Sequence, residues 1–375
     1  MLDNRSDNRN EMWNHCAPKV SEEFHQRFEQ TLEDLNARET AKRKRPMKFK
    51  VLLAAAALCV LASGTVLAAE WFGWNTQILN KFQPSQKQQE QLPETGAIQN
   101  VEQVSTVNDV PVTLKQVIHD NYNLYLLCEI TLPENISIDE TQRENLVFDG
   151  FSVLIDGKDP SEIVPNASYS GGGSFMESDD DTVSNTLYYE ISYLFGAPID
   201  WNGRTLSLSL GDLQTSYKKA ALPEECDTLA SGPWTFDYSM DDSSDLTWTI
   251  EVNNTYDFGG YDILINSIEI SPLSYVVHAD YGTAMKVEED ERNTFEYNGD
   301  DPGIELGDRL AIRKIVYKDG TEIAYPDDMF TDGGVYGPNE DQSEYLVREA
   351  FVRIIDVDQI QSIYLMQGDV EITLQ

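Results

Sequence analysis

Hydrophobic and polar residues follow three different patterns along this chain. Between residues 18 and 38 apolar residues recur about every fourth position, residues 51–69 form one uncharged apolar run, and from about residue 97 onward apolar and polar residues alternate. A spacing of three to four residues is typical of one face of a helix, and a spacing of two is typical of a half-buried strand. The pattern therefore predicts helices before residue 97 and strands after it.

The uncharged run comprises 19 residues, VLLAAAALCVLASGTVLAA, between Lys50 and Glu70. At about 1.5 Å per residue a helix of that length spans roughly 28 Å, close to the roughly 30 Å of a bilayer's hydrocarbon core. The basic AKRKRPMKFK precedes the run and the aromatic EWFGW follows it. Basic residues favour the cytoplasmic side and aromatic residues favour the interface. We therefore expect one transmembrane helix at 51–70, with the N-terminus in the cytoplasm and the C-terminus outside the cell membrane.

A cleaved secretory signal is the alternative for the same run. Met47 begins MKFKVLLAAAALCVL, and Val66-Leu67-Ala68 resembles a signal-peptidase site. If translation starts at Met1, the signal would have an n-region of about fifty residues, several times the usual length. This favours a retained anchor, and both alternatives place residues 75–375 outside.

The segment 1–50 contains a predicted amphipathic helix in KVSEEFHQRFEQTLEDLNAR, with Ser21 as its N-cap and acids in its first turn. Its apolar stripe has only Met12 and Trp13 to pack against within this segment, so it needs a partner. That partner is a cytoplasmic protein or the membrane surface beside the basic run. The residues expected to form the partner-binding face are Trp13, Phe24, Phe28, Leu32 and Leu35.

Residues 71–96 are predicted to form a helical stalk or linker. The sequence WNTQILNKF places its large apolar residues at helical spacing, and the Gln-rich PSQKQQEQL follows. We expect this stalk to lie on the outer leaflet. It ends in LPETG, which has the form of a sortase signal but lies far from the C-terminus, where sorting requires it.

From residue 97 the period-two pattern predicts a mainly β region of two stacked β-sandwich, immunoglobulin-like domains, at 97–220 and 221–375. The alternation lapses near residues 218–232, which marks the expected boundary. Three dipeptides, Asp156-Gly157, Asn202-Gly203 and Asp319-Gly320, predict β-hairpin turns, the second of them between TLYYEISYL and TLSLSL.

Charge is divided unevenly along the chain. Residues 1–50 carry 11 Lys or Arg and 9 Asp or Glu, whereas the remaining residues carry 16 and 56. Such an acidic surface repels phosphate backbones, which excludes nucleic acid as a partner of the β region. Its expected partners are neutral or cationic molecules or metal ions.

Catalytic signals are weak, so we expect no enzyme and no cofactor. Only His119 and His278 lie in the β region, without a hydrolase or metalloprotease motif, and both are expected to be structural. The run Gly171–Ser174 lacks the strand, helix and lysine of a phosphate loop and is interpreted as a mobile surface loop. A disulfide between Cys128 and Cys226 is the less favoured alternative to free thiols.

Acidic clusters recur in the β region without the spacing of an EF-hand. They are expected to be solvated loops, with calcium binding as the alternative. The clusters lie at 179–181, 241–245, 288–291, 300–301 and 327–328.

The order of these parts resembles a known family. An amphipathic helix, a basic run and an Ala-rich span ending in AAEWFGWN are followed by VTLKQVIHDNYNLYLLCEIT, YLFGAPIDWNGRTLSLSL and REAFVRIIDVDQIQSIYL. These resemble the DUF family 4179 proteins of Gram-positive bacteria, which are often described as anti-sigma-factor-like. The quoted motifs are structural patterns and carry no catalytic signature.

The resemblance implies a transmembrane regulator in signal transduction. Its cytoplasmic helix would hold an extracytoplasmic-function (ECF) sigma factor, and its outer domains would sense or bind a cell-wall or protein ligand. The chain lacks the zinc-binding motif of zinc anti-sigma factors. The alternative is a surface-displayed binding or adhesion protein with no sigma-factor partner.

Overall fold

The computed structural model describes residues 73–136, 138, 140–164, 169–176, 185–217, 225–241, 243–258, 260–286, 306–324, 334–339, 341–365 and 370–374. All of them belong to one compact unit, Thr65–Gln375. The predicted cytoplasmic segment at 1–50 and the predicted membrane helix at 51–70 lie outside the described residues. Among the residues that are described, no helix has the length and apolarity needed to cross a bilayer.

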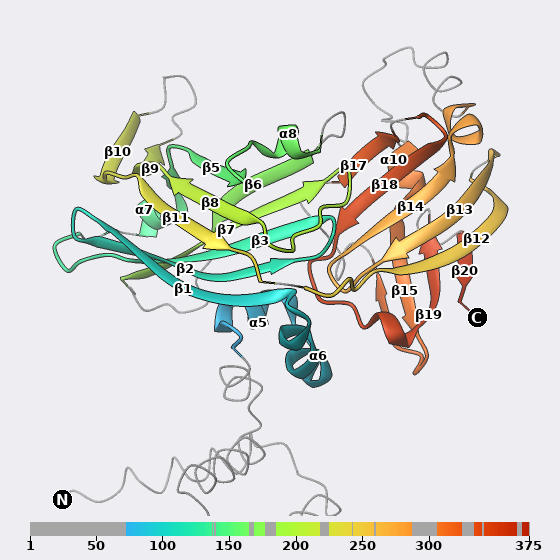
Figure 1. The fold of residues 1–375 in the computed structure, drawn as a ribbon, viewed down its shortest axis with the longest axis horizontal. Coiled ribbons are helices and arrows are strands. Elements are labelled where there is room, and N and C mark those ends of the chain that lie inside the picture. Colours follow the sequence, from blue (N-terminus) through green and yellow to red (C-terminus); the bar gives the residue numbers. More distant parts are fainter. Residues whose placement is uncertain are drawn as a thin grey trace, which may run out of the picture. The chain divides into compact units, whose positions relative to one another are not determined.

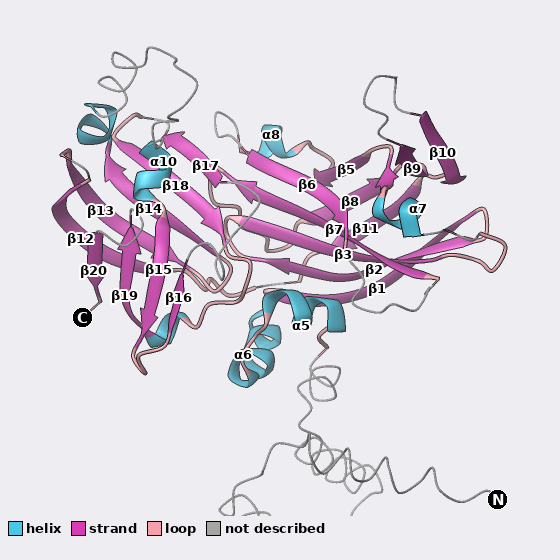
Figure 2. Ribbon diagram, turned by 180° about the vertical axis from the view of Figure 1, so that it is seen from behind, coloured by secondary structure: helices cyan, strands magenta, loops and turns pink. Residues whose placement is uncertain are grey.

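Antiparallel strands dominate the described chain, which confirms the predicted mainly β fold (Figure 1, Figure 2). They fall into two sets, each with its own hydrophobic core. Every pairing between neighbouring strands in these sets is antiparallel.

The first set forms a five-stranded sheet in the order β1-β2-β3-β7-β6 and two three-stranded sheets in the orders β10-β9-β4 and β11-β8-β5. Their core lies between the five-stranded sheet and the two smaller sheets. The elements are β1 (Ile98–Val107), β2 (Val110–His119), β3 (Asn123–Thr131), α7 (Glu140–Glu144), β4 (Leu146–Phe148), β5 (Phe151–Ile155), α8 (Pro160–Ile163), β6 (Tyr169–Phe175), β7 (Thr186–Phe195), β8 (Thr205–Leu210), β9 (Leu213–Tyr217), β10 (Glu225–Ala230) and β11 (Trp234–Ser239).

The second set forms a five-stranded sheet in the order β12-β13-β14-β18-β17 and a four-stranded sheet in the order β16-β15-β19-β20, again around one core. The elements are β12 (Trp248–Asp257), β13 (Asp262–Ile270), β14 (Ser274–Asp280), α10 (Leu306–Leu310), β15 (Ile312–Tyr317), β16 (Glu322–Ala324), β17 (Gly334–Pro338), β18 (Glu344–Ala350), η2 (Val357–Gln359), β19 (Ile360–Leu365) and β20 (Val370–Thr373).

Three short helical elements precede the strands: α5 (Thr76–Phe82), α6 (Gln86–Gln91) and the 3₁₀ helix η1 (Leu92–Thr95). Asn75 caps α5, because its side chain accepts a hydrogen bond from the Gln77 amide, and Ser85 opens a capping box on α6. The apolar face of α5 packs against the outer face of the first five-stranded sheet and against the second set. The predicted helical segment at 71–96 is therefore helical in part, but it is packed into the body of the protein.

The two sets repeat one design. The register of β1 against β2 shifts between Asn100 and Gln103 of β1. The register of β12 against β13 shifts at the equivalent place, between Glu251 and Asn254 of β12, which is 151 residues later. A second shift lies between Leu114 and Gln116 of β2, where β2 pairs with β3. Its equivalent lies between Ile265 and Ser267 of β13, where β13 pairs with β14, again 151 residues later. Sheet orders β11-β8-β5 and β20-β19-β15 also correspond. The second set is thus a structural repeat of the first.

Equivalent turns of the two repeats meet. The Asp120 carboxylate accepts hydrogen bonds from the Tyr122 and Asn123 amides within the β2–β3 turn, as the Ser271 hydroxyl does from the amides of Leu273 and Ser274 in the β13–β14 turn. The Asp120 carboxylate also accepts hydrogen bonds from the hydroxyls of Ser271 and Ser274. A buried polar contact therefore joins the repeats.

Two local predictions differ from the structure. The expected boundary near residue 220 falls between β9 and β10, which are hydrogen-bonded to each other, so the first set extends to Ser239. The predicted hairpin at Asn202-Gly203 is wrong, because β7 pairs with β3 and β6 whereas β8 pairs with β5 and β11. A turn dipeptide bends the chain, but it does not determine whether the next strand stays in the same sheet. The Asp319-Gly320 hairpin between β15 and β16 is confirmed.

Candidate functional site

The sequence-predicted partner-binding residues lie outside the described part of the chain. These residues are Trp13, Phe24, Phe28, Leu32 and Leu35. The site described below lies instead in the β region, around the edge strand β6.

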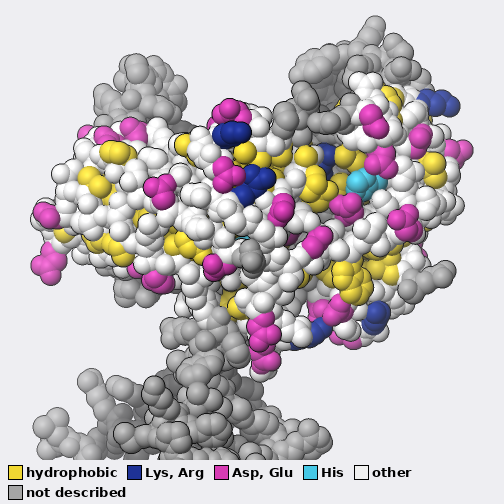
Figure 3. Space-filling view, viewed as in Figure 1, with side chains coloured by type: hydrophobic (Ala, Val, Ile, Leu, Met, Phe, Trp, Pro, Cys, Tyr) yellow, Lys and Arg dark blue, Asp and Glu magenta, His cyan; other side chains and the backbone are white. Residues whose placement is uncertain are grey.

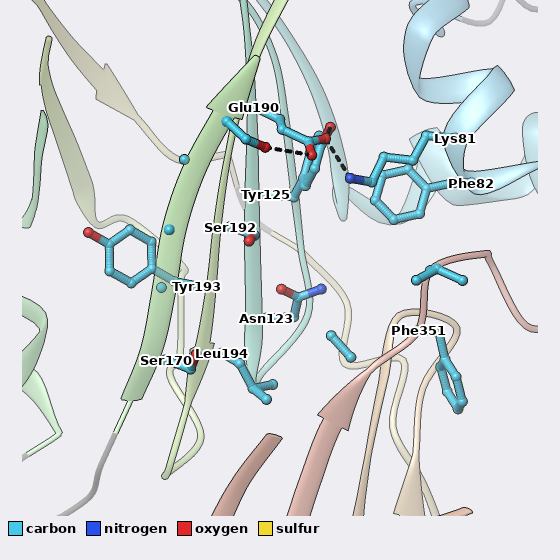
Figure 4. Close-up of a pocket in the computed structure, with 16 residues that line it drawn as sticks. Lys81, Phe82, Asn123, Tyr125, Ser170, Glu190, Ser192, Tyr193, Leu194 and Phe351 are labelled. Atoms are coloured by element: carbon cyan, nitrogen blue, oxygen red, sulfur yellow. Dashed lines mark hydrogen bonds and ion pairs between the residues drawn. The ribbon is translucent and has the colours of Figure 1, made fainter. Parts of the chain in front are cut away.

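An outer pocket of 470 Å³ lies on the face of the first five-stranded sheet that α5 covers in part. Its floor is formed by β3, β7 and β6, one wall by α5, and the other wall by Ala350–Val352 at the end of β18 (Figure 4). Both repeats therefore contribute to the outer pocket. Its volume falls within the range of roughly 300–1,000 Å³ that is usual for ligand pockets.

One carboxylate anchors the polar end of the outer pocket. Glu190 Oε2 lies 2.5 Å from Lys81 Nζ and accepts a hydrogen bond of 2.6 Å from the Tyr125 hydroxyl, while Glu190 Oε1 accepts one of 3.2 Å from Ser174 (Figure 4). The Lys81 ammonium also lies over the Tyr125 and Phe82 rings, at 5.1 and 5.9 Å from their centroids. Carboxylate and aromatic faces together form a subsite for a cation.

Burial and the neighbouring Glu190 charge raise the pKa of Tyr125 well above its usual value. The Tyr125 hydroxyl therefore stays protonated near neutral pH and acts as a hydrogen-bond donor to Glu190.

The floor of the outer pocket offers unpaired polar groups. Asn123, Ser170 and Ser192 line it, and their side chains make no hydrogen bond to any described residue. A Cβ added at Gly172 would meet no atom within 4 Å, so the space above this residue is open. The floor can therefore approach a ligand closely and hydrogen-bond to it.

An inner pocket of 380 Å³ lies on the opposite, core-side face of β6. It shares Gly173 and Ser174 with the outer pocket, but its other lining is largely apolar and aromatic. Those residues are Leu146, Val147, Phe148, Gly150, Phe151 and Tyr189. One strand therefore has an ionic pocket on one face and an apolar pocket on the other.

The strand between the two pockets was not predicted from the sequence. Gly171–Ser174 was interpreted as a surface loop, but these residues form β6 in register with β7. Added Cβ atoms at Gly171 and Gly173 would lie 2.6 and 2.3 Å from the Tyr193 and Tyr189 side chains. The glycines are thus required under two tyrosine rings, and Tyr169 and Phe175 at the strand ends are the signal that could have indicated a strand.

Neither histidine forms a catalytic group with a nucleophile in the described chain. His119 is buried, and burial lowers its pKa to about 4. His278 Nδ1 lies 2.9 Å from Glu344 Oε2. The predicted structural placement of both agrees with these contacts.

Metal and thiol chemistry receive no support from the described residues. Within them no three His, Cys, Asp or Glu side chains are arranged to hold a metal ion. The acidic clusters at 179–181, 288–291, 300–301 and 327–328 lie outside the described residues, as does position 242 of the cluster at 241–245. Cys128 is a buried free thiol, not a disulfide partner, and burial raises its pKa to about 12. Such a thiol is unreactive.

Acidic side chains are scattered over the face shown in Figure 3, and basic side chains are fewer. An acidic surface of this kind favours a cationic over an anionic ligand.

Residues 42–131 match the sequence profile of the family described as domain of unknown function (DUF4179), which confirms the predicted family. No curated protein sequence matches the chain. A solved structure, titled "The crystal structure of the conserved domain protein from Bacillus anthracis", is similar over 72% of this chain and 76% of its own, with 10% sequence identity and a TM-score of 0.40. A similarity this low has no bearing on function.

Proposed function

We propose that this DUF4179 chain is a single-pass membrane regulator resembling an anti-sigma factor. Residues 1–50 dock an ECF sigma factor in the cytoplasm, residues 51–70 cross the membrane, and the two repeats are immunoglobulin-like sandwich domains that bind a ligand outside. Ligand binding at the repeats changes the position of the chain where it leaves the membrane. That change is passed to the docking helix.

The observation that supports this proposal is the burial of the chain directly after the apolar run. Trp74 is 2% exposed, and its indole nitrogen donates a 2.9 Å hydrogen bond to the Gln89 carbonyl. The Gln116 amide nitrogen of β2 donates a 2.6 Å hydrogen bond to the Gly73 carbonyl. Only two residues, 71 and 72, lie between the expected end of the membrane helix and Gly73.

The same segment contacts both repeats. Lys81 pairs with Glu190 of the first repeat, and the Ile354 amide of the second repeat donates a 2.8 Å hydrogen bond to the Phe82 carbonyl. Lys87 of α6 also contacts the second repeat, because its ammonium lies 3.0 Å from the Asp358 carboxylate. A shift of one repeat against the other would therefore act on α5 and α6, which lead to the membrane.

The proposal is tested by purifying the tagged full chain from its host and identifying the co-purified proteins by mass spectrometry. A Phe24→Asp/Phe28→Asp variant should lose an ECF sigma factor that the parent chain retains. Its matched control, Gln26→Asp/Gln30→Asp, adds the same charge at the same helical spacing on the polar face and should retain the sigma factor. No sigma factor with the parent chain, or equal recovery with both variants, rejects the regulator.

A surface-displayed binding protein is the second candidate, favoured by the two pockets at β6. It requires the ligand site but no cytoplasmic partner. The co-purification experiment separates the two candidates, because only the regulator retains a sigma factor.

A further inference from the structure

We propose that the free edge of β6 binds an extended peptide of alternating basic and apolar residues, which adds a sixth strand to the first five-stranded sheet. The basic side chain enters the outer pocket and pairs with Glu190, and the apolar side chain enters the inner pocket. This inference rests on the proposed ligand-binding role of the β region, and it does not depend on a sigma-factor partner.

The backbone of β6 has unused hydrogen-bonding groups. The Met176 amide donates to the Tyr188 carbonyl of β7, so in this antiparallel register the pairs Ser174–Glu190 and Gly172–Ser192 are also hydrogen-bonded. The amide and carbonyl groups of Gly171 and Gly173 then point away from β7. Among the described strands, none is hydrogen-bonded to β6 on that side.

This edge lacks the features that usually block strand addition. Exposed edge strands are commonly protected by a charged side chain, a proline or a bulge. The sequence of β6, YSGGGSF, contains neither a charge nor a proline, and its register with β7 is continuous. An incoming strand therefore meets donors and acceptors of β6 that no described strand uses.

The two pockets fit the alternation of a bound strand. Successive side chains of a strand point to opposite faces of the sheet. The outer and inner pockets lie on opposite faces of β6 and share Gly173 and Ser174. In strand addition, main-chain hydrogen bonds supply affinity and pockets for alternate side chains supply specificity. Neighbouring residues of one peptide can thus fill both pockets.

The outer pocket already holds a cation from the chain itself. Lys81 Nζ lies 2.5 Å from Glu190 Oε2, and the Lys81 side chain is 30% exposed, so a competing ammonium can reach the carboxylate. The open space above Gly172 leaves a path from the sheet edge to Glu190. Lys81 therefore acts as a substitute that the side chain of a bound peptide replaces.

The second repeat provides an internal comparison. Its equivalent edge strand, β17, ends in Pro338, and its Val335 is buried against Tyr122 and Leu194 of the first repeat. Val335 of β17 is thus covered within the chain, whereas Gly172 of β6 faces the open outer pocket. Among the described residues, β6 thus combines an edge without proline and an open pocket, and β17 does not.

The chemistry of the site favours a peptide over a glycan or a second copy of the chain. Sugar rings stack on exposed aromatic faces, but the rings of Phe82, Tyr125 and Phe351 in the outer pocket are only 3, 3 and 2% exposed, and the exposed Tyr169 of β6 packs against Tyr193. Two copies of a chain with a formal net charge of −38 would repel each other. A basic peptide matches both the free strand edge and the acidic surface.

The test uses the purified full chain in neutral detergent and a fluorescently labelled alternating Lys–Val hexapeptide, with binding measured by anisotropy at two salt concentrations. An alternating Glu–Val peptide controls for charge. A Lys–Val peptide with N-methylated amides, which keeps the charge but cannot pair along a strand edge, controls for backbone bonding. Only the unmodified Lys–Val peptide should bind specifically.

Four variants test the geometry. Glu190→Gln should weaken binding roughly tenfold, as loss of a charge-assisted hydrogen bond does, whereas Glu129→Gln on the same sheet face should not. Gly172→Val, which fills the outer pocket, should abolish binding, while its control Thr249→Val on the exposed edge strand β12 should not. Thermal unfolding of each variant reports whether its fold is intact.

A fifth variant, Lys81→Met, should bind the peptide several-fold more tightly, because it removes the internal competitor. The proposal is overturned if the Glu190 and Glu129 variants weaken binding equally, since bulk charge then explains the affinity. Equal binding of the N-methylated peptide would also overturn it. So would displacement of the peptide by an N-acetylglucosamine oligomer. Failure of this test with a retained sigma factor would reject the peptide site alone.

Discussion

The Asp120 carboxylate accepts a hydrogen bond of 2.6 Å from the hydroxyl of Ser274, and this bond joins equivalent turns of the two repeats. The same carboxylate accepts hydrogen bonds of 2.8 and 2.7 Å from the amides of Tyr122 and Asn123. Nearby, the Tyr122 hydroxyl donates a 2.9 Å hydrogen bond to Glu269 of the second repeat. A single buried acid therefore shapes its own turn and holds the neighbouring repeat.

Replacing Asp120 should destabilise both the β2–β3 turn and the contact between the two repeats. Asp120→Ala leaves two amides and two serine hydroxyls without their acceptor, so we expect a loss of about 3 kcal/mol in the free energy of unfolding. Asp156→Ala, which removes the acceptor of the Thr205 amide at an exposed turn, should cost about 1 kcal/mol or less. Urea denaturation measures both values, and equal losses would contradict the role assigned to Asp120.

His119 should make stability depend on pH. Burial lowers its pKa from 6.5 to about 4, so between these values the unfolded chain binds a proton that the folded chain does not. The folded state therefore loses stability as the pH falls below 6.5. We expect His119 to account for about 2 kcal/mol of loss between pH 7 and pH 5. The His119→Gln variant should lose about 2 kcal/mol less than the parent chain in the free energy of unfolding between pH 7 and pH 5, as measured by urea titration. An equal loss in both proteins would contradict this role of His119.

A glycine-to-valine substitution should reduce stability on one face of β6 and have little effect on the other. Gly171→Val places a side chain against the Tyr193 ring, where a Cβ alone would lie 2.6 Å away, and overpacking should cost about 1–3 kcal/mol. Gly172→Val projects into open space and should change stability by less than about 0.5 kcal/mol. Thermal and urea unfolding compare them, and equal destabilisation would contradict the assigned strand register.

Packing of α5 should stabilise the chain next to the predicted membrane helix. Ile78 lies on the buried face of α5 and is fully buried, so Ile78→Ala should cost about 3 kcal/mol and expose the segment before β1 to protease. Asn80→Ala on the exposed face of α5 should have no such effect. Limited proteolysis with mass spectrometry locates the cleavage, and equal resistance of the two variants would show that α5 is not needed to hold this segment.

Sequence patterns predicted strands where burial alternates strictly. In β8 the buried Leu206, Leu208 and Leu210 face one side, as their spacing indicated. The β2 strand was likewise visible from Val112 and Leu114. Local periodicity succeeds here because one face of each strand lies on a core.

Pairing between distant segments was not visible in the same way. The motifs FGAPID and FVRIID occupy equivalent places in the two repeats. In the first, the amides of Phe195 and Ile199 donate to the carbonyls of Tyr122 and Asn121. In the second, the amides of Phe351 and Ile355 donate to the carbonyls of Leu273 and Pro272. Three identities in six residues, 156 positions apart, mark this correspondence in the sequence. The packing of α5 escaped prediction too, because an apolar helix face does not reveal which surface covers it.

The candidate site was missed because its functional groups come from distant parts of the chain. Lys81 and Glu190 are 109 residues apart, and neither belongs to a recognisable motif. The glycines of β6 resembled a loop because their packing role depends on tyrosines of β7. Register and tertiary contact, not local composition, create both pockets.

The central claim is that the β repeats lie outside the cell membrane while residues 1–50 lie in the cytoplasm. It is tested most directly by adding protease to intact cells that express the full chain with different tags at its two ends. The account predicts that the C-terminal tag is digested and that the N-terminal tag survives on a membrane-bound fragment. Digestion of the N-terminal tag would contradict it, as would a mature protein in the culture fluid that begins at Ala69 or Glu70.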